Sequence, residues 1–284
     1  MAARILFALL FLIPSFAYGD EGVYNSFEEA LYEPFKVRVL KITGKGLREL
    51  PDIFDRFPNL EEVNFSNNKI NELPPSFYQS KKLLSVKLHK NRLEKLSPAV
   101  SRLQKLEYLS LSFNNLKDLP DSIGYLPRLR ELNLKGNELN KVPESLGMLR
   151  NLEILSLISN TLVRLPDQLT RLSKLELLDL GDNRLEALPE SIGNMKALKF
   201  LYLQKNRLTT IPESIGKCTE LRELDLVNCG ALTLPQTLSD IQNLNRIYID
   251  DRVTSFIPRT ANRFRQRIFL VPRGTMLYRS SQTM

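Results

Sequence analysis

Residues 198–216 read LKFLYLQKNRLTTIPESIG, and the same arrangement recurs at a fixed period along most of the chain. With Leu198 as position 1, leucine falls at positions 4, 6 and 11, and asparagine falls at position 9. Ile-Pro occupies positions 14 and 15, and Ile-Gly occupies positions 18 and 19. The step from Leu175 to Leu198 continues in both directions without an insertion. It defines ten units, which begin at Val37, Leu60, Leu83, Leu106, Leu129, Leu152, Leu175, Leu198, Leu221 and Leu244.

Positions 3 to 7 of each unit alternate between variable residues and leucine, which predicts a short strand with one buried face. Each buried leucine contributes about 1.5–3 kcal/mol, but a single unit cannot cover its own apolar face, so the units must stack. We expect a curved parallel sheet about 43 Å long, from nine spacings of about 4.8 Å. Proline at position 15 begins the return segment, where a long helix is disfavoured.

The pattern L-x-x-L-x-L-x-x-N-x-L at a fixed period resembles the leucine-rich repeat (LRR). The resemblance covers residues 37–258, and the closing L-P-x-x-I-G-x-L is similar to the subclass found in plant intracellular Ras-group LRR proteins and in many bacterial LRR proteins. It implies an α/β solenoid, a horseshoe with a parallel concave sheet of about ten strands and an irregular or short-helical convex side. It also implies that partners bind on the concave side.

The asparagine at position 9 carries an amide that both donates and accepts, so it can satisfy backbone groups where each strand turns away from the sheet. In LRR proteins this residue forms a structural ladder, and we favour that role over a catalytic one. Lys45, Cys229 and Arg252 replace it in units one, nine and ten. The predicted ladder comprises Asn68, Asn91, Asn114, Asn137, Asn160, Asn183 and Asn206.

Residues 1–19 have the order of a secretory signal peptide. Arg4 precedes the apolar run 5–13, and small residues stand just before Asp20. The apolar run is too short to span a bilayer, which needs about 20 residues. We expect cleavage near Gly19 and an exported protein, either periplasmic, cell-surface or secreted. The alternative is a buried core helix.

Two segments outside the repeats are expected to cap the stack. Residues 20–36 contain Ser26 and Glu29, a capping box that predicts a helix over 27–33 closed by Pro34. Residues 259–284 are predicted to form a C-terminal cap with an Arg-rich tail. Those arginines could instead bind nucleic acid or an anionic surface.

Catalysis finds no support in the sequence. The single histidine, His89, lies at position 7 beside Lys87 and Lys90, without a carboxylate nearby in the sequence to orient it. Cys218 takes a core position and Cys229 takes the asparagine position, so we expect two separate buried thiols, with a disulfide as the alternative. Two thiols alone cannot hold a structural zinc ion, and phosphate-binding or zinc-protease motifs are absent. We therefore expect no enzyme activity, no cofactor and no metal site.

The concave positions 3, 5 and 7, with positions 8 and 10 beside them, are free to vary. Position 3 is apolar in three consecutive units, at Ile154, Leu177 and Phe200, which we call the ridge. Exposed apolar surface often marks an interaction site, and aromatic residues are enriched at binding hot spots; the alternative is that such residues simply suit strands. The predicted partner-binding residues are Tyr108, Ile154, Ile158, Leu177, Phe200, Tyr202 and Val227.

Charged residues flank the ridge in the sequence, basic ones in unit three and acidic ones toward the C-terminal end. The concave face is therefore expected to be basic, then apolar, then acidic. The acidic residues are Asp179, Asp182, Asp225, Asp250 and Asp251. Asp179 and Asp225 lie about 9.6 Å apart by strand spacing, too far to share a calcium ion.

These observations predict a non-catalytic, exported scaffold that binds a protein through its concave face. We expect a monomer without a membrane span and without a nucleic-acid partner. The net charge is +8, but basic and acidic residues are interspersed along the chain, which indicates a generally solvated surface. One alternative is an intracellular Ras-group-like signalling adaptor, and another is a binder of anionic polymers through the Arg-rich tail.

Overall fold

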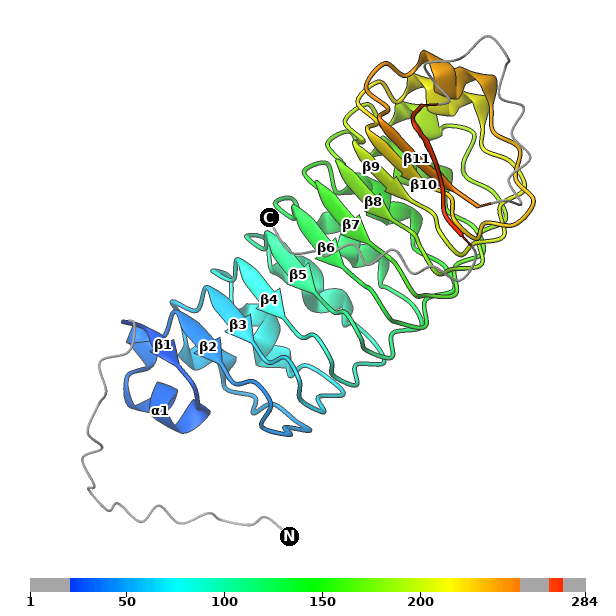
Figure 1. Ribbon diagram of the computed structural model, residues 1–284. Coiled ribbons are helices and arrows are strands. Elements are labelled where there is room, and N and C mark those ends of the chain that lie inside the picture. The colour runs from blue at the N-terminus through cyan, green and yellow to red at the C-terminus, as the bar shows by residue number, and fades with distance from the viewer. Residues whose placement is uncertain (1–20, 251–265, 273–284) are drawn as a thin grey trace.

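The computed structural model describes residues 21–250 and 266–272, and their strands form one sheet in which each strand pairs in parallel with the next one along the chain (Figure 1). The strands are β1 (Val23–Tyr24), β2 (Val39–Lys41), β3 (Glu62–Asn64), β4 (Ser85–Lys87), β5 (Tyr108–Ser110), β6 (Glu131–Asn133), β7 (Ile154–Ser156), β8 (Leu177–Asp179), β9 (Phe200–Tyr202), β10 (Glu223–Asp225), β11 (Arg246–Ile249) and β12 (Ile268–Leu270).

The opposite layer consists of short 3-10 helices, one after each repeat strand from β2 to β10 (Figure 1). One α-helix, α1 (Phe27–Tyr32), and the 3-10 helix η1 (Pro34–Lys36) precede the repeats. The other 3-10 helices are η2 (Phe54–Arg56), η3 (Pro75–Gln79), η4 (Pro98–Arg102), η5 (Asp121–Tyr125), η6 (Glu144–Met148), η7 (Asp167–Arg171), η8 (Ile192–Asn194), η9 (Glu213–Lys217) and η10 (Gln236–Asp240).

This arrangement confirms the predicted leucine-rich-repeat solenoid. The sheet has twelve strands instead of about ten, because each end of the stack adds one. At the N-terminal end Val23 of β1 pairs with Val39, and at the C-terminal end Ile268 of β12 pairs with Ile247. Parallel pairing at both ends continues the hydrogen-bond ladder beyond the repeats.

The N-terminal cap helix begins as the sequence predicts. The Ser26 hydroxyl accepts a 3.1 Å hydrogen bond from the Glu29 amide, and α1 ends at Tyr32, two residues before Pro34. At the other end Arg267 donates a 3.0 Å hydrogen bond to the Ile241 carbonyl. The predicted signal peptide and most of the Arg-rich tail lie outside the described residues. No helix in the described ranges is long and apolar enough to span a bilayer.

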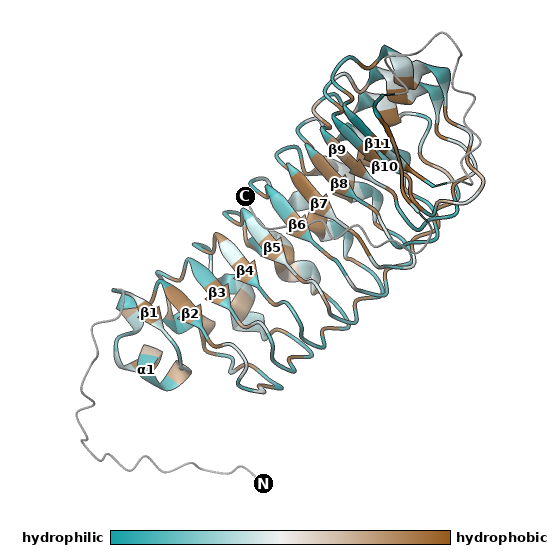
Figure 2. Cartoon of the chain, viewed as in Figure 1, coloured by the Kyte–Doolittle hydropathy of each residue, from teal (hydrophilic) through white to brown (hydrophobic). Residues whose placement is uncertain are grey.

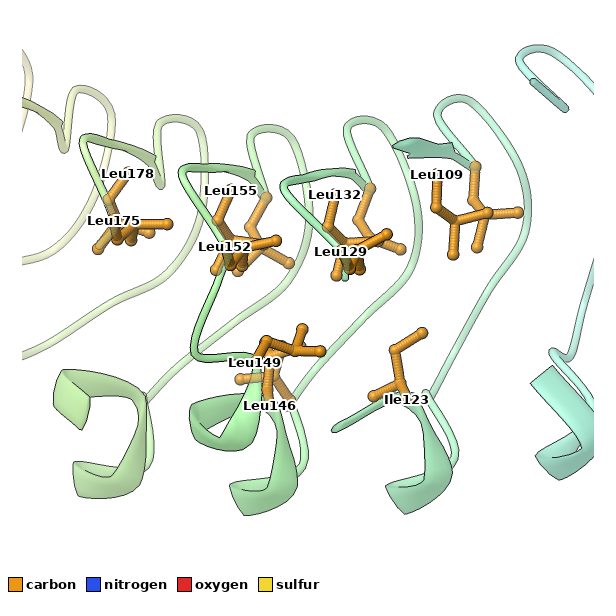
Figure 3. Packing of buried hydrophobic residues seen from close by; sticks show 14 of the residues in the cluster. Leu109, Ile123, Leu129, Leu132, Leu146, Leu149, Leu152, Leu155, Leu175 and Leu178 are labelled. Atoms are coloured by element: carbon orange, nitrogen blue, oxygen red, sulfur yellow. The ribbon is translucent and has the colours of Figure 1, made fainter. Parts of the chain in front are cut away.

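Leucines from the strands and the 3-10 helices meet in one continuous core (Figure 3). Leu152 and Leu155 of unit six are fully buried. On the convex side, Leu146 and Leu149 of unit five face them from η6 and the turn that follows it. Because every unit repeats these contacts with both neighbours, the core runs the length of the sheet.

Glycine at position 19 lets neighbouring 3-10 helices pack closely on the convex side. A Cβ atom on Gly124 would collide with the backbone carbonyl of Ser145, and one on Gly147 would collide with that of Gln168. Since carbonyls belong to the backbone and cannot move aside, a side chain at these positions would push the units apart.

The asparagine ladder joins each unit to the one before it. Asn137 shows the pattern: its Oδ1 accepts from the Leu116 amide at 3.1 Å, and its Nδ2 donates to the carbonyls of Leu111 at 3.0 Å and Leu134 at 2.9 Å. In unit nine Cys229 takes over one of these roles, because its thiol donates to the Leu203 carbonyl at 3.0 Å. The ladder satisfies backbone groups that the strands leave unpaired inside the core.

The residue before each asparagine adopts a left-handed conformation that turns the chain from the strand into the core. Position 8 has positive φ in nine successive units, and five of them carry residues that favour this conformation, glycine, asparagine or aspartate. Phe113, with φ 53°, is the bulkiest exception. The left-handed residues are Gly44, Asn67, Lys90, Phe113, Gly136, Ser159, Asp182, Lys205 and Asn228.

Substitution of Asn137 by alanine is expected to lower the free energy of unfolding by about 2–4 kcal/mol. The substitution leaves buried backbone donors and acceptors without hydrogen bonds, and each unsatisfied group costs about 1–3 kcal/mol. Urea unfolding followed by circular dichroism measures this. The control is Asn140→Ala, an exposed asparagine in the same unit, for which a change within about 0.5 kcal/mol is expected. Equal effects of the two substitutions would contradict the ladder's role.

Candidate interaction surface on the concave face

The ridge lies on three adjacent strands near the middle of the sheet. Ile154 of β7 is in register with Leu177 of β8, which is in register with Phe200 of β9. Figure 2 shows these strands in brown beside the hydrophilic β6. All three side chains are partly exposed. Parallel strands about 4.8 Å apart therefore present a continuous apolar strip to the concave side.

Of the other predicted contact residues, two join this surface directly and a third lies farther along the sheet. Ile158 and Tyr202 are partly exposed beside the ridge, and the Tyr202 ring centroid lies 6.4 Å from that of Phe200. Tyr108 is also partly exposed, but Glu131 of β6 separates it from Ile154.

Val227 is only 4% exposed, contrary to its predicted role. It lies two residues after the end of β10, and its amide donates a 3.0 Å hydrogen bond to Oδ1 of Asp225. The hydrogen bond to Asp225 is made by the Val227 backbone, and the side chain is buried. Val227 therefore does not contribute to the accessible concave surface.

Glu131 and Tyr108 form a partly buried polar boundary on the N-terminal side of the ridge. Burial raises the pKa of the Glu131 carboxyl. Burial also raises the pKa of the Tyr108 hydroxyl, with a further rise from the charge of Glu131. The Lys87 ammonium lies 5.8 Å from the Tyr108 ring centroid and pairs with Glu62 at 2.8 Å. The strip therefore has a charged border on this side.

A second cluster, which the sequence analysis missed, lies beyond this boundary around Phe113. Its ring meets the His89 imidazole edge to face at 5.2 Å, and the Lys135 ammonium lies 5.5 Å from its centroid. His89 Nδ1 lies 2.8 Å from the Ser112 hydroxyl, which is buried. A bulky aromatic in left-handed backbone, where most units carry small or polar residues, was the available sequence signal. Strained residues of this kind cluster at functional sites.

Two of the five acidic residues predicted for the C-terminal end of the concave face are buried, so the predicted acidic surface is smaller than expected there. Asp179 is partly exposed and Asp182 is exposed, and Asp251 lies outside the described residues. Asp225 is 3% exposed and Asp250 is fully buried. Asp225 lies in register between Tyr202 and Tyr248, whose strands flank it on both sides. Asp250 accepts a 2.6 Å hydrogen bond from the Asn228 amide. These carboxylates hold backbone amides and present little negative surface to a partner.

The two cysteines are separate buried thiols, and neither forms a disulfide. Cys218 donates to the Ile192 carbonyl at 3.4 Å, and burial raises its pKa to about 11. Within the described ranges, no three His, Cys, Asp or Glu side chains converge as a metal site would require. His89 Nδ1 and the Ser112 hydroxyl are within hydrogen-bond distance, and the pKa of the imidazole is lowered by burial and by the charges of Lys90 and Lys135.

Comparisons with known proteins agree with this architecture. Family profiles described as leucine-rich repeat region, leucine rich repeat and Leucine Rich Repeat match residues 154–254, 81–139 and 59–80. No protein with a curated description matches the chain significantly. The chain is therefore a leucine-rich-repeat protein, as the sequence pattern predicted.

Solved structures give the same result. An LRR protein of Leptospira interrogans, LIC12759, is 34% identical with a TM-score of 0.75, over 79% of this chain and 57% of that one. The LRR ectodomain of the Arabidopsis thaliana receptor kinase GASSHO1/SCHENGEN3, in complex with CASPARIAN STRIP INTEGRITY FACTOR 2, is 24% identical with a TM-score of 0.56, over 75% of this chain and 36% of that one. The PEPR1–AtPEP1 structure is 25% identical with a TM-score of 0.55, over 76% and 39%. The chain thus spans little more than half the length of the bacterial protein, and less of the other two.

The lowered pKa of His89 gives a testable pH dependence. Between the folded pKa and the unfolded value of about 6.5, the unfolded chain binds more protons, so stability falls as the pH is lowered through this window. Phe113→Asn removes the ring that covers the imidazole and keeps a residue tolerant of left-handed backbone. It is expected to move the pKa back up toward 6.5.

Proton NMR can follow this titration without ambiguity, because His89 is the only histidine. The control is Tyr125→Asn, an exposed aromatic at the end of η5 and away from the concave face, which should leave the pKa of His89 unchanged. An unchanged pKa in Phe113→Asn would show that the ring does not govern the desolvation of the imidazole.

Proposed function

We propose that this protein is a non-catalytic scaffold that binds a protein partner through its concave face, with the ridge Ile154–Leu177–Phe200 as the contact centre. The observation that supports this most strongly is the register of three partly exposed apolar side chains on adjacent strands. Such a strip loses contact with water when a partner covers it, at about 25 cal/mol per Å² of apolar area.

The fold itself does not require apolar residues at this position. Other strands carry Glu62, Ser85, Glu131 and Arg246 at the same place in the repeat, and those strands pair in the same parallel register. Position 3 is therefore free to vary, and three successive apolar choices favour a binding role over strand propensity.

The structural neighbours are consistent with a protein ligand. The GASSHO1/SCHENGEN3 ectodomain was solved in complex with CASPARIAN STRIP INTEGRITY FACTOR 2, and PEPR1 with AtPEP1. LRR proteins are generally interaction scaffolds, and repeat solenoids offer extended concave surfaces for binding. We extend this general role to the present chain; the identity of its partner does not follow from the resemblance.

We also propose that residues 1–19 direct export and are removed near Gly19, because charge, apolar run and small residues occur in the expected order. The alternative is an intracellular signalling adaptor like the Ras-group LRR proteins. Mass spectrometry of the native N-terminus distinguishes them. A chain that starts at Asp20 supports export, whereas an intact Met1 or Ala2 terminus supports the intracellular alternative.

The double substitution Leu177→Glu/Phe200→Glu is expected to raise the Kd for the partner at least about tenfold, because it places two charges in the contact centre. Affinity capture with wild-type protein identifies partners, and titration calorimetry with the purified partner measures the change. The control Val163→Glu/Thr209→Glu adds the same charge at exposed positions after the asparagine ladder and away from the ridge. It should leave Kd within about twofold.

Circular dichroism establishes that both variants are folded. A partner that binds both variants as tightly as wild type would exclude the ridge. Binding that instead falls steeply with salt and disappears on removal of residues 259–284 would favour the Arg-rich tail as a site for anionic polymers.

A further inference from the structure

Basic side chains are concentrated along one lateral edge of the solenoid. Positions 20, 22 and 23 of each unit lie where the chain leaves a 3-10 helix and approaches the next strand, and these loops follow one another along one side of the sheet (Figure 1). In units one to eight, eleven of these residues are exposed cations. They are Arg56, Lys81, Lys82, Arg102, Lys105, Arg128, Arg150, Arg171, Lys174, Lys196 and Lys217.

The charge of this edge, which we call the basic edge, is unbalanced. Glu220 is the single acidic residue among the same positions, so their net charge is +10, compared with +8 for the whole chain. On the opposite edge, positions 10, 12 and 13 of the same units carry nine cations and six acids, a net charge of +3. The protein's positive charge is therefore not spread evenly over its surface.

Ion pairs do not neutralise the basic edge. The six ion pairs found in the described ranges involve none of its eleven cations. Lys82 and Lys174 donate instead to the neutral side chains of Asn59 at 2.6 Å and Asn151 at 2.8 Å. Three of the four neighbouring carboxylates at position 2 in these units are paired with other cations: Glu61 with Arg38, Glu153 with Arg130 and Glu176 with Lys199.

Exposed apolar side chains stand among these cations. Tyr125 and Met148, the last residues of η5 and η6, are 54% and 50% exposed at position 20. Phe35 is 74% exposed on the same edge of the N-terminal cap. The Phe35 carbonyl accepts a 2.7 Å hydrogen bond from the Asn59 side chain. The Pro127 carbonyl, at position 22, accepts the equivalent 2.7 Å hydrogen bond from Asn151. Phe35 therefore occupies the place of position 22 in the cap.

A recess of about 1000 Å³ opens on the basic edge near its N-terminal end. Lys81, Lys82, Arg102 and Lys105 line it together with the apolar Phe57, and Asp55 is its one acidic lining residue. The recess therefore combines positive charge with apolar walls, as a lipid phosphate and its glycerol backbone would require.

We propose that the basic edge docks the solenoid sideways on an anionic lipid bilayer. The negative potential of such a surface attracts nearby lysine and arginine side chains, and exposed aromatic and aliphatic side chains enter the headgroup boundary. Because the cations occupy equivalent positions of successive units, they form a row, and many of them can contact one plane of headgroups at the same time. The apolar side chains favour a bilayer over a soluble polyanion, which offers charge without an apolar layer. The concave face stays open to a partner in this orientation.

Sedimentation with lipid vesicles tests the proposal. The full chain is mixed with vesicles of phosphatidylcholine alone, or of phosphatidylcholine and phosphatidylglycerol in a two-to-one ratio, and the difference between the two isolates the anionic contribution. Residues 1–19 and the tail are the same in every variant and contribute equally. Lys81→Glu/Lys105→Glu/Arg150→Glu is compared with Lys69→Glu/Arg92→Glu/Lys117→Glu, which makes the same charge change at exposed positions of the opposite edge.

The first variant is expected to reduce partitioning onto anionic vesicles at least about tenfold, and the second at most about threefold. Tyr125→Ser/Met148→Ser should also reduce it, without any change in charge. Circular dichroism verifies folding, and Lys81→Gln/Lys105→Gln/Arg150→Gln replaces the first variant if it does not fold.

Two results would overturn the proposal. Equal losses in the two edge variants would show that net charge alone governs binding. Binding to immobilised heparin that depends on the basic edge, without binding to anionic vesicles, would assign the edge to a soluble polyanion.

Discussion

The buried side-chain amide at position 9 is the interaction on which the stack depends. A strand of three residues must end inside the core, where its backbone groups lose water without gaining sheet partners. Each asparagine restores those hydrogen bonds, and it does so partly with the preceding unit, as Asn160 does through the Leu139 amide and the Leu134 carbonyl. A repeat is therefore completed only by its neighbour. Cooperative stacking follows from polar satisfaction as well as from leucine burial.

Most of this architecture could be predicted from the sequence, because the period, the leucines and the asparagine encode one backbone repeated ten times. The ends could be predicted less well. The terminal strands β1 and β12 lack the repeat pattern, and pairing with an existing sheet edge is what makes them strands. Val227 and Asp225 also deviated from expectation. Asp225 is flanked by tyrosines of adjacent strands, which lie one repeat away in the sequence on either side.

The basic edge does not appear in the order of charges along the chain. Counted along the chain, basic and acidic residues alternate and suggest an ordinary solvated surface. Counted by position in the repeat, the cations collect on one edge, and most acids lie elsewhere. The distinction matters in a solenoid because residues one repeat apart become neighbours. Two surfaces result: an apolar strip across the strands and a basic edge beside them. They face different directions, so occupation of one leaves the other accessible.

Glycine at position 19, present in units four, five, seven and eight, also affects the shape that any partner meets. An arc forms when the elements of the outer layer are spaced more widely than the strands, which are about 4.8 Å apart. Full α-helices pack at about 8–10 Å and would bend the sheet strongly. Short 3-10 helices pack more closely where a glycine contacts a backbone carbonyl of the next unit, as at Gly124 and Gly147. This close packing reduces the difference between the spacing of the outer layer and that of the strands. The radius of curvature is correspondingly large and the inner surface shallow. A partner of ordinary globular size can then lie along several units at once, instead of being enclosed by the two ends of a tight horseshoe.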